Sequence, residues 1–216
     1  MTFKETKSAA VGAAALQELS KESQGAYEAF LYDCDGTLAD NMQAHKDTYV
    51  NVAARGGINI DPSIIDEFAG LPIPQVVQEI NKRYGSSFDP LAFERDKSEL
   101  FYTEYIQQTK PIQFVVDHLI AHAETKRIGV VSGGSRKMVQ KTLEVLGLAS
   151  LVEVLVCAGD TQKGKPYPDP FLLAAQQLGV SPHKCLVFED GEAGTKAAER
   201  AGMNWIRIDY ITGKDQ

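Results

Sequence analysis

Ala29-Phe30-Leu31-Tyr32-Asp33-Cys34-Asp35-Gly36-Thr37 is the stretch of the chain that decides its fold. The apolar run ends abruptly in two aspartates, as in a buried strand that delivers polar side chains at its carboxyl end. On an extended segment Asp33 and Asp35 project to the same side, and Gly36 lets the chain turn sharply just afterwards. Two like charges held this close need a cation, and hard oxygen ligands select Mg²⁺. The motif therefore predicts a magnesium site.

An aspartate-rich turn, with or without bound calcium, is the alternative interpretation of this motif. A calcium-binding EF-hand loop needs glycine at its sixth position, where Leu38 stands. Asp190 follows another apolar run, Cys185-Leu186-Val187-Phe188, and can supply a further oxygen ligand. These observations favour magnesium.

Beyond Pro111 the chain alternates between apolar runs and amphipathic segments. This alternation is typical of a Rossmann-like parallel sheet covered by helices on both faces. With the opening strand at 29–32, we expect strands at 127–131, 152–157, 184–188 and 204–208, and helices at 113–125, 135–146, 169–178 and 192–201. The fold class predicted is α/β.

The segment from 41 to 108 has a different, mostly helical pattern, broken by proline and glycine. Helices are expected there at 41–55, 62–69, 74–84 and 89–108, and a further helix at 8–24. The predicted organisation is therefore an N-terminal helical extension (1–27), an α/β core (28–40 and 109–216) and an inserted α-helical domain (41–108).

Composition narrows the class of protein. The chain has 216 residues, 44% of them hydrophobic, and a net charge of −7 without a basic block. A nucleic-acid partner is not expected, because such proteins usually carry a basic stripe. No apolar run reaches the roughly 20 residues of a membrane span, and no secretory signal is recognisable. A cytoplasmic protein, a monomer or weak dimer, is expected.

The three cysteines, Cys34, Cys157 and Cys185, stand far apart, so neither a disulfide framework nor a structural zinc site is indicated. They are interpreted as small core residues. His118 and His122 could form a metal pair, but solvated or partly packed histidines are the favoured interpretation. Trp205 is expected in the core.

Two further motifs could bind anions. Ser132-Gly133-Gly134 follows an apolar run and precedes a helix, where free backbone N–H groups attract phosphate, although Ser132 alone is more often a helix cap. The segment 159–166 resembles a phosphate-binding loop of nucleotide triphosphatases, but Pro166 replaces the required hydroxyl residue. That site is disfavoured, whereas Lys165 suits phosphate binding as a point charge.

Taken together, these motifs resemble the four ordered motifs of the haloacid dehalogenase-like (HAD) hydrolase superfamily. The resemblance covers about residues 28–210 and is strongest to the branch of beta-phosphoglucomutases and sugar-phosphate phosphatases, whose helical cap the insertion resembles. The motifs are Asp33-Cys34-Asp35-Gly36-Thr37, Ser132, Lys165-Pro166 with Pro168-Asp169, and Glu189-Asp190 with Gly194.

The resemblance implies a role for each of these residues. Asp33 corresponds to a nucleophile that becomes an aspartyl-phosphate, and Asp35 to the acid and base. Ser132, Gly133 and Lys165 correspond to groups that hold the phosphoryl oxygens. The Mg²⁺ ligands implied are Asp33, Asp190, the backbone carbonyl of Asp35 and, less directly, Glu189. In the insertion, the resemblance implies substrate contacts by His45, Gly70 and Lys97.

The predicted function is a Mg²⁺-dependent phosphatase acting on a small phosphorylated metabolite, with a sugar phosphate as the expected substrate. Two alternatives stay open: a phosphomutase built on the same site, and a catalytically idle regulator that binds a sugar phosphate. The insertion weighs against the mutase, because Ile73 stands where the mutase pattern has an arginine that grips a second phosphate.

Overall fold

The computed structural model describes residues 3–68 and 71–213. The chain divides into two compact units. The first is built from the segment up to Asp40 and the segment from Lys110 onward, and the second is Asn41–Thr109. No helix among the described residues is long and apolar enough to cross a membrane.

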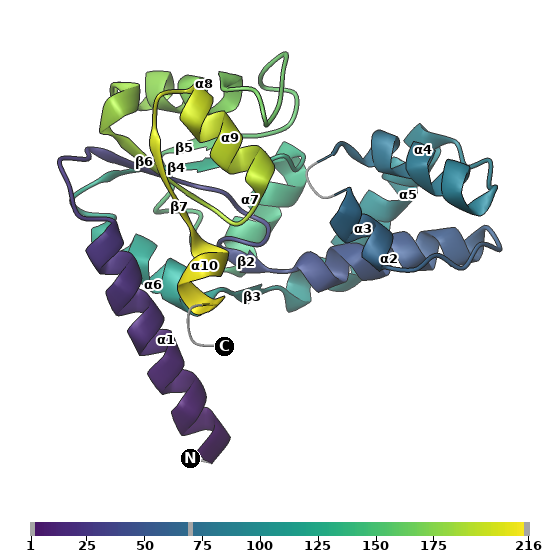
Figure 1. Ribbon diagram of the computed structural model, residues 1–216, viewed down its shortest axis with the longest axis horizontal. Coiled ribbons are helices and arrows are strands. Elements are labelled where there is room, and N and C mark those ends of the chain that lie inside the picture. Colours follow the sequence, from purple (N-terminus) through teal and green to yellow (C-terminus); the bar gives the residue numbers. More distant parts are fainter. Residues whose placement is uncertain (1–2, 69–70, 214–216) are drawn as a thin grey trace. The chain divides into compact units, whose positions relative to one another are not determined.

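The first unit contains a five-stranded parallel sheet (Figure 1). The strand order is β5-β4-β1-β6-β7, which places the opening strand at the centre. Their bounds are β1 (Ala29–Tyr32), β4 (Arg127–Val131), β5 (Val154–Val156), β6 (Cys185–Glu189) and β7 (Asn204–Arg207). In register, Tyr32 lies beside Val130 and Phe188, so the carboxyl ends of three neighbouring strands coincide. The predicted α/β class is confirmed.

Helices cover both faces of this sheet because its strands are apolar on both sides. Phe30 and Tyr32 pack on the face covered by α1 (Phe3–Glu22), α6 (Gln113–His122), α7 (Arg136–Val145) and α10 (Ile208–Gly213). Ala29 and Leu31 face α8 (Asp169–Leu178) and α9 (Glu192–Arg200). Successive side chains of β1 thus point to opposite faces of the sheet and pack into two separate apolar layers.

Helix α1 packs onto the sheet unit through Ala15 and Leu19, which are buried in the same layer as α6. It runs from Phe3 to Glu22, earlier at both ends than the helix expected at 8–24. Helix α10 was not expected, since the sequence suggested only a strand end there. It forms directly after β7 and buries Ile208 and Ile211.

The second unit has its own core and is helical, as its pattern predicts. Its helices are α2 (Met42–Arg55), α3 (Ser63–Glu67), α4 (Ile73–Tyr84) and α5 (Pro90–Leu100). The single helix expected at 89–108 is α-helical only up to Leu100. It continues as a π-helical turn at Phe101–Tyr105 and a 3-10 turn at Ile106–Gln108. In the first unit, β2 (Ala39–Asp40) pairs with β3 (Lys110–Pro111) in antiparallel fashion, next to the points where the chain leaves and returns.

Two of the expectations about single residues are wrong. Trp205 is 42% exposed rather than in the core, because β7 is the last strand of the sheet. His118 is fully buried rather than solvated or partly packed: its Nδ1 lies 2.9 Å from the Tyr32 hydroxyl and its Nε2 2.8 Å from that of Ser23. Both ring nitrogens are therefore engaged by hydroxyl groups. The three cysteines are free and buried, as predicted.

Candidate active site

Asp33 lies immediately after β1, at the carboxyl edge of the sheet. Its backbone N–H donates to the carbonyl oxygen of Phe188, so the ladder between β1 and β6 continues one residue beyond the strand. This hydrogen bond fixes the start of the acidic loop beside Glu189, the last residue of β6, and Asp190, which follows it. Parallel strands place their ligand-binding residues at this edge.

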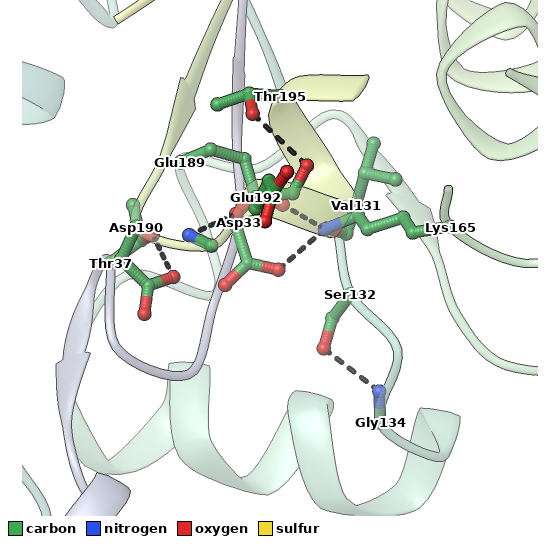
Figure 2. Close-up of polar contacts among 11 residues, drawn as sticks. Asp33, Thr37, Val131, Ser132, Gly134, Lys165, Glu189, Asp190, Glu192 and Thr195 are labelled. Carbon is green, nitrogen blue, oxygen red and sulfur yellow. Dashed lines mark hydrogen bonds and ion pairs between the residues drawn. The ribbon is translucent and has the colours of Figure 1, made fainter. Parts of the chain in front are cut away.

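Lys165 is the cationic centre of the site (Figure 2). Its ammonium group donates to Asp33 Oδ1 at 2.6 Å, to Glu189 Oε1 at 2.6 Å and to the carbonyl oxygen of Val131 at 2.8 Å. All three N–H donors of the ammonium therefore have a partner. The ring of Phe171 lies 5.2 Å from Nζ and adds a cation–π contact. Lys165 thus joins β1, β4 and β6.

Burial and charge act in opposite directions on the Lys165–Asp33 pair. Burial lowers the pKa of Lys165, but the carboxylates of Asp33 and Glu189 outweigh it and hold the pKa above the ordinary value for lysine. Burial raises the pKa of Asp33, and Glu189 and Asp190 raise it further, against the opposing effect of Lys165. The lysine alone therefore does not neutralise the acidic centre.

Asp33, Glu189 and Asp190 each offer a carboxylate oxygen, and the three oxygens lie within 4.8 Å of one another. Lys165 contacts the carboxylates of Asp33 and Glu189 but not that of Asp190, and with its charge counted the group carries a formal charge of about −2. Burial, followed by the charge of Glu189, raises the pKa of Asp190 to about 6. Thr37 donates a hydrogen bond to Asp190 Oδ1 at 3.2 Å. A hard divalent cation such as Mg²⁺ fits this donor set and this charge.

Two glycines let the carboxylates approach so closely. Gly36 has φ +87°, and a Cβ there would overlap the carboxylate of Asp190. A Cβ on Gly194, in the first turn of α9, would overlap the carboxylate of Glu189. Glu189 Oε2 also accepts a hydrogen bond from the Gly191 N–H at 3.1 Å. The start of α9 is therefore shaped around Glu189.

Ser132 lies buried at the end of β4, on the other side of β1 from Glu189. Its Oγ accepts a hydrogen bond from the Gly134 N–H at 3.0 Å. Helix α7 begins only at Arg136, so Ser132 is not its N-cap, which is the alternative that its position suggested. A Cβ on Gly134 would lie 3.3 Å from Ser132 Oγ and 3.5 Å from Asp35 Oδ2. Ser132 and Asp35 therefore flank the same glycine.

The structure brings together the predicted residues of the first unit, with Asp35 half-buried and Gly133 exposed. The carbonyl of Val131 and the ring of Phe171 are additional contacts of Lys165. Nothing in the sequence marks them, because a backbone carbonyl has no residue signature and a core phenylalanine is common. Thr37 lies inside the opening motif, where its hydroxyl could have been recognised.

In the second unit, two predicted substrate residues contact each other. Lys97 Nζ lies 2.6 Å from His45 Nδ1, although the residues are 52 positions apart. The ring of His45 stacks on Phe101, with centroids 4.1 Å apart, and Lys97 is only 4% exposed. A protonated lysine can only donate, so Nδ1 accepts and a neutral His45 carries its proton on Nε2. Gly70 lies outside the described residues.

A parallel α/β sheet with acidic residues, a lysine and a serine at its carboxyl edge supplies the groups that an enzyme of phosphoryl transfer needs. The model of the haloacid dehalogenase-like hydrolase family matches residues 30–208, and the chain belongs to that family.

Named relatives agree with this assignment. The chain is 30% identical to fructose-1-phosphate phosphatase YqaB of Escherichia coli, over 84% of this chain and 96% of the relative. It is 31% identical to validoxylamine A 7'-phosphate phosphatase of Streptomyces hygroscopicus, over 82% of this chain and 83% of the relative. The family and these relatives identify the chain as a phosphoric monoester hydrolase.

A solved structure shows the same fold. CbbY from Rhodobacter sphaeroides, in complex with phosphate, superposes with a TM-score of 0.74 at 22% identity, over 83% of this chain and 84% of CbbY. The shared fold therefore includes most of both chains.

Proposed function

We propose that this protein is a Mg²⁺-dependent phosphatase that hydrolyses sugar monophosphates through an aspartyl-phosphate on Asp33. The observation that carries the proposal is the contact of one largely buried ammonium, Lys165, with two carboxylates, Asp33 and Glu189, beside Asp190. Such a group places a carboxylate nucleophile beside a fixed cation and beside further oxygen ligands for a metal ion, and phosphoryl transfer depends on this positioning and charge neutralisation.

The chemistry has two steps. In the first, a carboxylate oxygen of Asp33 attacks phosphorus, the bond from phosphorus to the sugar oxygen breaks, and Asp35 gives its proton to that oxygen. In the second, Asp35 takes a proton from water, and the resulting hydroxide attacks the aspartyl-phosphate. The bond to Asp33 then breaks, so inorganic phosphate leaves and both aspartates return to their starting states.

The residues around Asp33 divide the remaining tasks. Ser132 and the positive charge of Lys165 hold the phosphoryl oxygens, and Gly133, which follows Ser132, is exposed. Asp33, Asp190, Glu189 and the backbone carbonyl of Asp35 are the candidate ligands of Mg²⁺. When bound, the ion neutralises the charge that accumulates on the phosphoryl oxygens.

We assign recognition of the sugar to the second unit, with His45 and Lys97 as its polar contacts. The buried Lys97 ammonium holds the imidazole of His45 so that its Nε2–H is a donor for a substrate oxygen. Sugar phosphates are supported as substrates by the relatives, which are phosphatases of fructose 1-phosphate and of validoxylamine A 7'-phosphate.

Release of inorganic phosphate from a panel of sugar monophosphates tests the proposal. We expect turnover that stops when EDTA removes the metal and returns on addition of Mg²⁺. Asp33→Asn should fold normally but lose turnover, because an amide does not attack phosphorus, whereas Asp66→Asn, at an exposed aspartate outside the motifs, serves as a matched control. An Asp33→Asn enzyme that still turns over would remove Asp33 from this role. Tight sugar-phosphate binding by the wild-type protein without any turnover would favour the idle regulator.

A further inference from the structure

Two loops at the carboxyl edge of the sheet carry the groups proposed to hold the phosphoryl oxygens. The serine loop is residues 132–135, between β4 and α7, and the lysine loop is residues 157–168, between β5 and α8, with Lys165 in it. Strands β4 and β5 are hydrogen-bonded neighbours, so the two loops begin side by side. The Ala158 N–H donates to the carbonyl oxygen of Gly134 at 3.0 Å. The loops are therefore in direct contact near their starting points.

Asp160 connects the two loops a second time. Its Oδ2 accepts a hydrogen bond from the backbone N–H of Cys157 at 2.7 Å and another from the guanidinium of Arg136 at 2.6 Å. The same Nη2 of Arg136 also donates to the carbonyl oxygen of Leu155 at 3.0 Å. Arg136 is the first residue of α7 and directly follows the serine loop, whereas Asp160 belongs to the lysine loop. One ion pair thus joins both loops and the end of β5.

The stability of α7 does not explain why an arginine stands at position 136. A cation in the first turn of a helix is opposed by the partial positive charge of that end, and the first turn of α7 contains no acidic residue. The counter-charge comes instead from Asp160. The two side chains are 46% and 28% exposed, and ion pairs of this kind contribute little to the free energy of unfolding. The main effect of the pair is therefore on the position of the loops.

The position of Lys165 depends on the course of the lysine loop. All residues of this loop are described, and none of them belongs to a helix or strand. Its course is therefore set by single contacts. Those of Asp160 fix its beginning, and a hydrogen bond of 2.7 Å from Arg200 to the carbonyl oxygen of Pro166 fixes it next to the lysine.

From these contacts we infer that Asp160 and Arg136 are positioning residues, which hold the serine loop and the lysine loop at the spacing that one phosphoryl group needs. The pair acts through the loops and does not itself touch the phosphoryl group. This inference rests on the proposed function, in which Ser132 and Lys165 hold the phosphoryl oxygens. It adds that the affinity for phosphate depends on an ion pair outside the acidic centre.

The opposite ends of the same two strands offer a matched control. Arg127, at the start of β4, forms an ion pair at 2.5 Å with Glu153, the residue before β5, and their side chains are 50% and 40% exposed. Like Asp160, Glu153 also accepts a hydrogen bond from a backbone N–H, that of Ile128, at 3.2 Å. The control pair therefore resembles the inferred pair in its contacts but lies at the amino edge of the sheet, away from both loops.

Isothermal titration calorimetry with inorganic phosphate, in the presence of Mg²⁺, tests the inference without requiring turnover. Asp160→Ala should raise the Kd about tenfold, because the loops are no longer held together. Asp160→Asn should raise it about threefold, since its amide oxygen still accepts from the Cys157 N–H but no longer pairs with the charge of Arg136. Glu153→Ala should change the Kd by less than about twofold. Melting temperatures show whether each variant is folded.

Arg136→Gln completes the test. On its own it should raise the Kd about threefold, and it should add little in a protein that already carries Asp160→Ala, because the two residues act as a unit. Phosphate binding that is unchanged in the Asp160 variants, or weakened equally by Glu153→Ala, would overturn the inference and leave the proposed function standing. A wild-type protein that binds no inorganic phosphate would contradict the proposed phosphate site itself, and the inference with it.

Discussion

Gly194 and Glu189 lie so close together that a single added carbon at position 194 would overlap the Glu189 carboxylate. That carboxylate accepts from Lys165 and from the Gly191 N–H, so its position determines where the lysine sits. The first turn of α9 is therefore part of the site although it supplies no side chain to Lys165.

Gly194→Ala should lower kcat by about a hundredfold, because an ångström-scale displacement of Glu189 also displaces Lys165. Gly191→Ala is the matched control from the same loop. Its Cβ would lie 3.7 Å from Glu189 Oε2, an ordinary contact, and it keeps the N–H donor. Steady-state phosphate release from both variants checks the prediction. Equal activities would show that the position of Glu189 has little effect on the reaction.

Lys165→Ala should reduce kcat by about a thousandfold, since it removes the ammonium that contacts both Asp33 and Glu189. Lys163→Ala, two residues earlier, should change it by less than about twofold. Its ammonium lies over the ring of the exposed Tyr167 instead. Steady-state kinetics with Mg²⁺ compares the two variants. If the Lys163 variant had the larger defect, the wrong lysine would have been assigned to the site.

His118 should make the protein less stable at mildly acidic pH. Burial, with a smaller contribution from His122, lowers the pKa of His118 to about 3 from 6.5. The folded state therefore binds fewer protons than the unfolded state between these values, and stability falls as pH drops below 6.5. Between pH 7 and pH 5 the loss from this residue is about 2 kcal/mol.

Urea unfolding at several pH values measures this effect. Other groups also titrate, so the informative quantity is the difference between the wild type and His118→Gln, which retains hydrogen-bonding capacity but does not titrate. The variant should be less stable at pH 7 and have a flatter pH profile. His183→Gln, outside the buried layer, should keep the wild-type slope. A slope unchanged in His118→Gln would contradict the assignment.

The sequence was sufficient to predict the strands and the residues of the acidic centre. Short apolar runs that end in acidic residues indicate both features. The apolar part of each run forms a buried strand, β1 or β6, and the acidic residues stand at the carboxyl end of that strand. Asp33 and Glu189 are 156 positions apart, yet each follows such a run. Their proximity follows once the sheet is known to be parallel.

Features that depend on neighbours in space could not be predicted in this way. Trp205 has the hydrophobicity of a core residue, but only the strand order shows that β7 is an edge. From the sequence alone, His118 is expected to be a surface histidine. Its burial depends on contacts with Tyr32 and Ser23, which are distant in the sequence. The π-helical turn that begins at Phe101 has no local signal.

Lys97→Met should weaken the use of sugar phosphates while sparing a small aryl phosphate. Without the ammonium, the tautomer of His45 is no longer fixed with its proton on Nε2. We expect KM for the preferred sugar phosphate to rise about tenfold, with a much smaller change for para-nitrophenyl phosphate. Arg95→Met, an exposed position on the same helix, is the control. Equal losses on both substrates would assign Lys97 to the structure of the unit rather than to recognition.

The final prediction separates hydrolysis from isomerisation. A phosphomutase must hold a bisphosphate intermediate at both ends, which needs a donor such as arginine for the second phosphate. Position 73 carries isoleucine instead, and Ile73 packs as a partly buried residue against the core of the second unit. Water rather than a sugar hydroxyl should therefore receive the phosphoryl group. We expect phosphate release from β-glucose 1-phosphate without its conversion to glucose 6-phosphate, with both products followed in a coupled assay. Conversion faster than phosphate release would establish the mutase instead. If the wild type only hydrolyses its substrate because it lacks an arginine for the second phosphate, Ile73→Arg should increase the conversion of β-glucose 1-phosphate to glucose 6-phosphate.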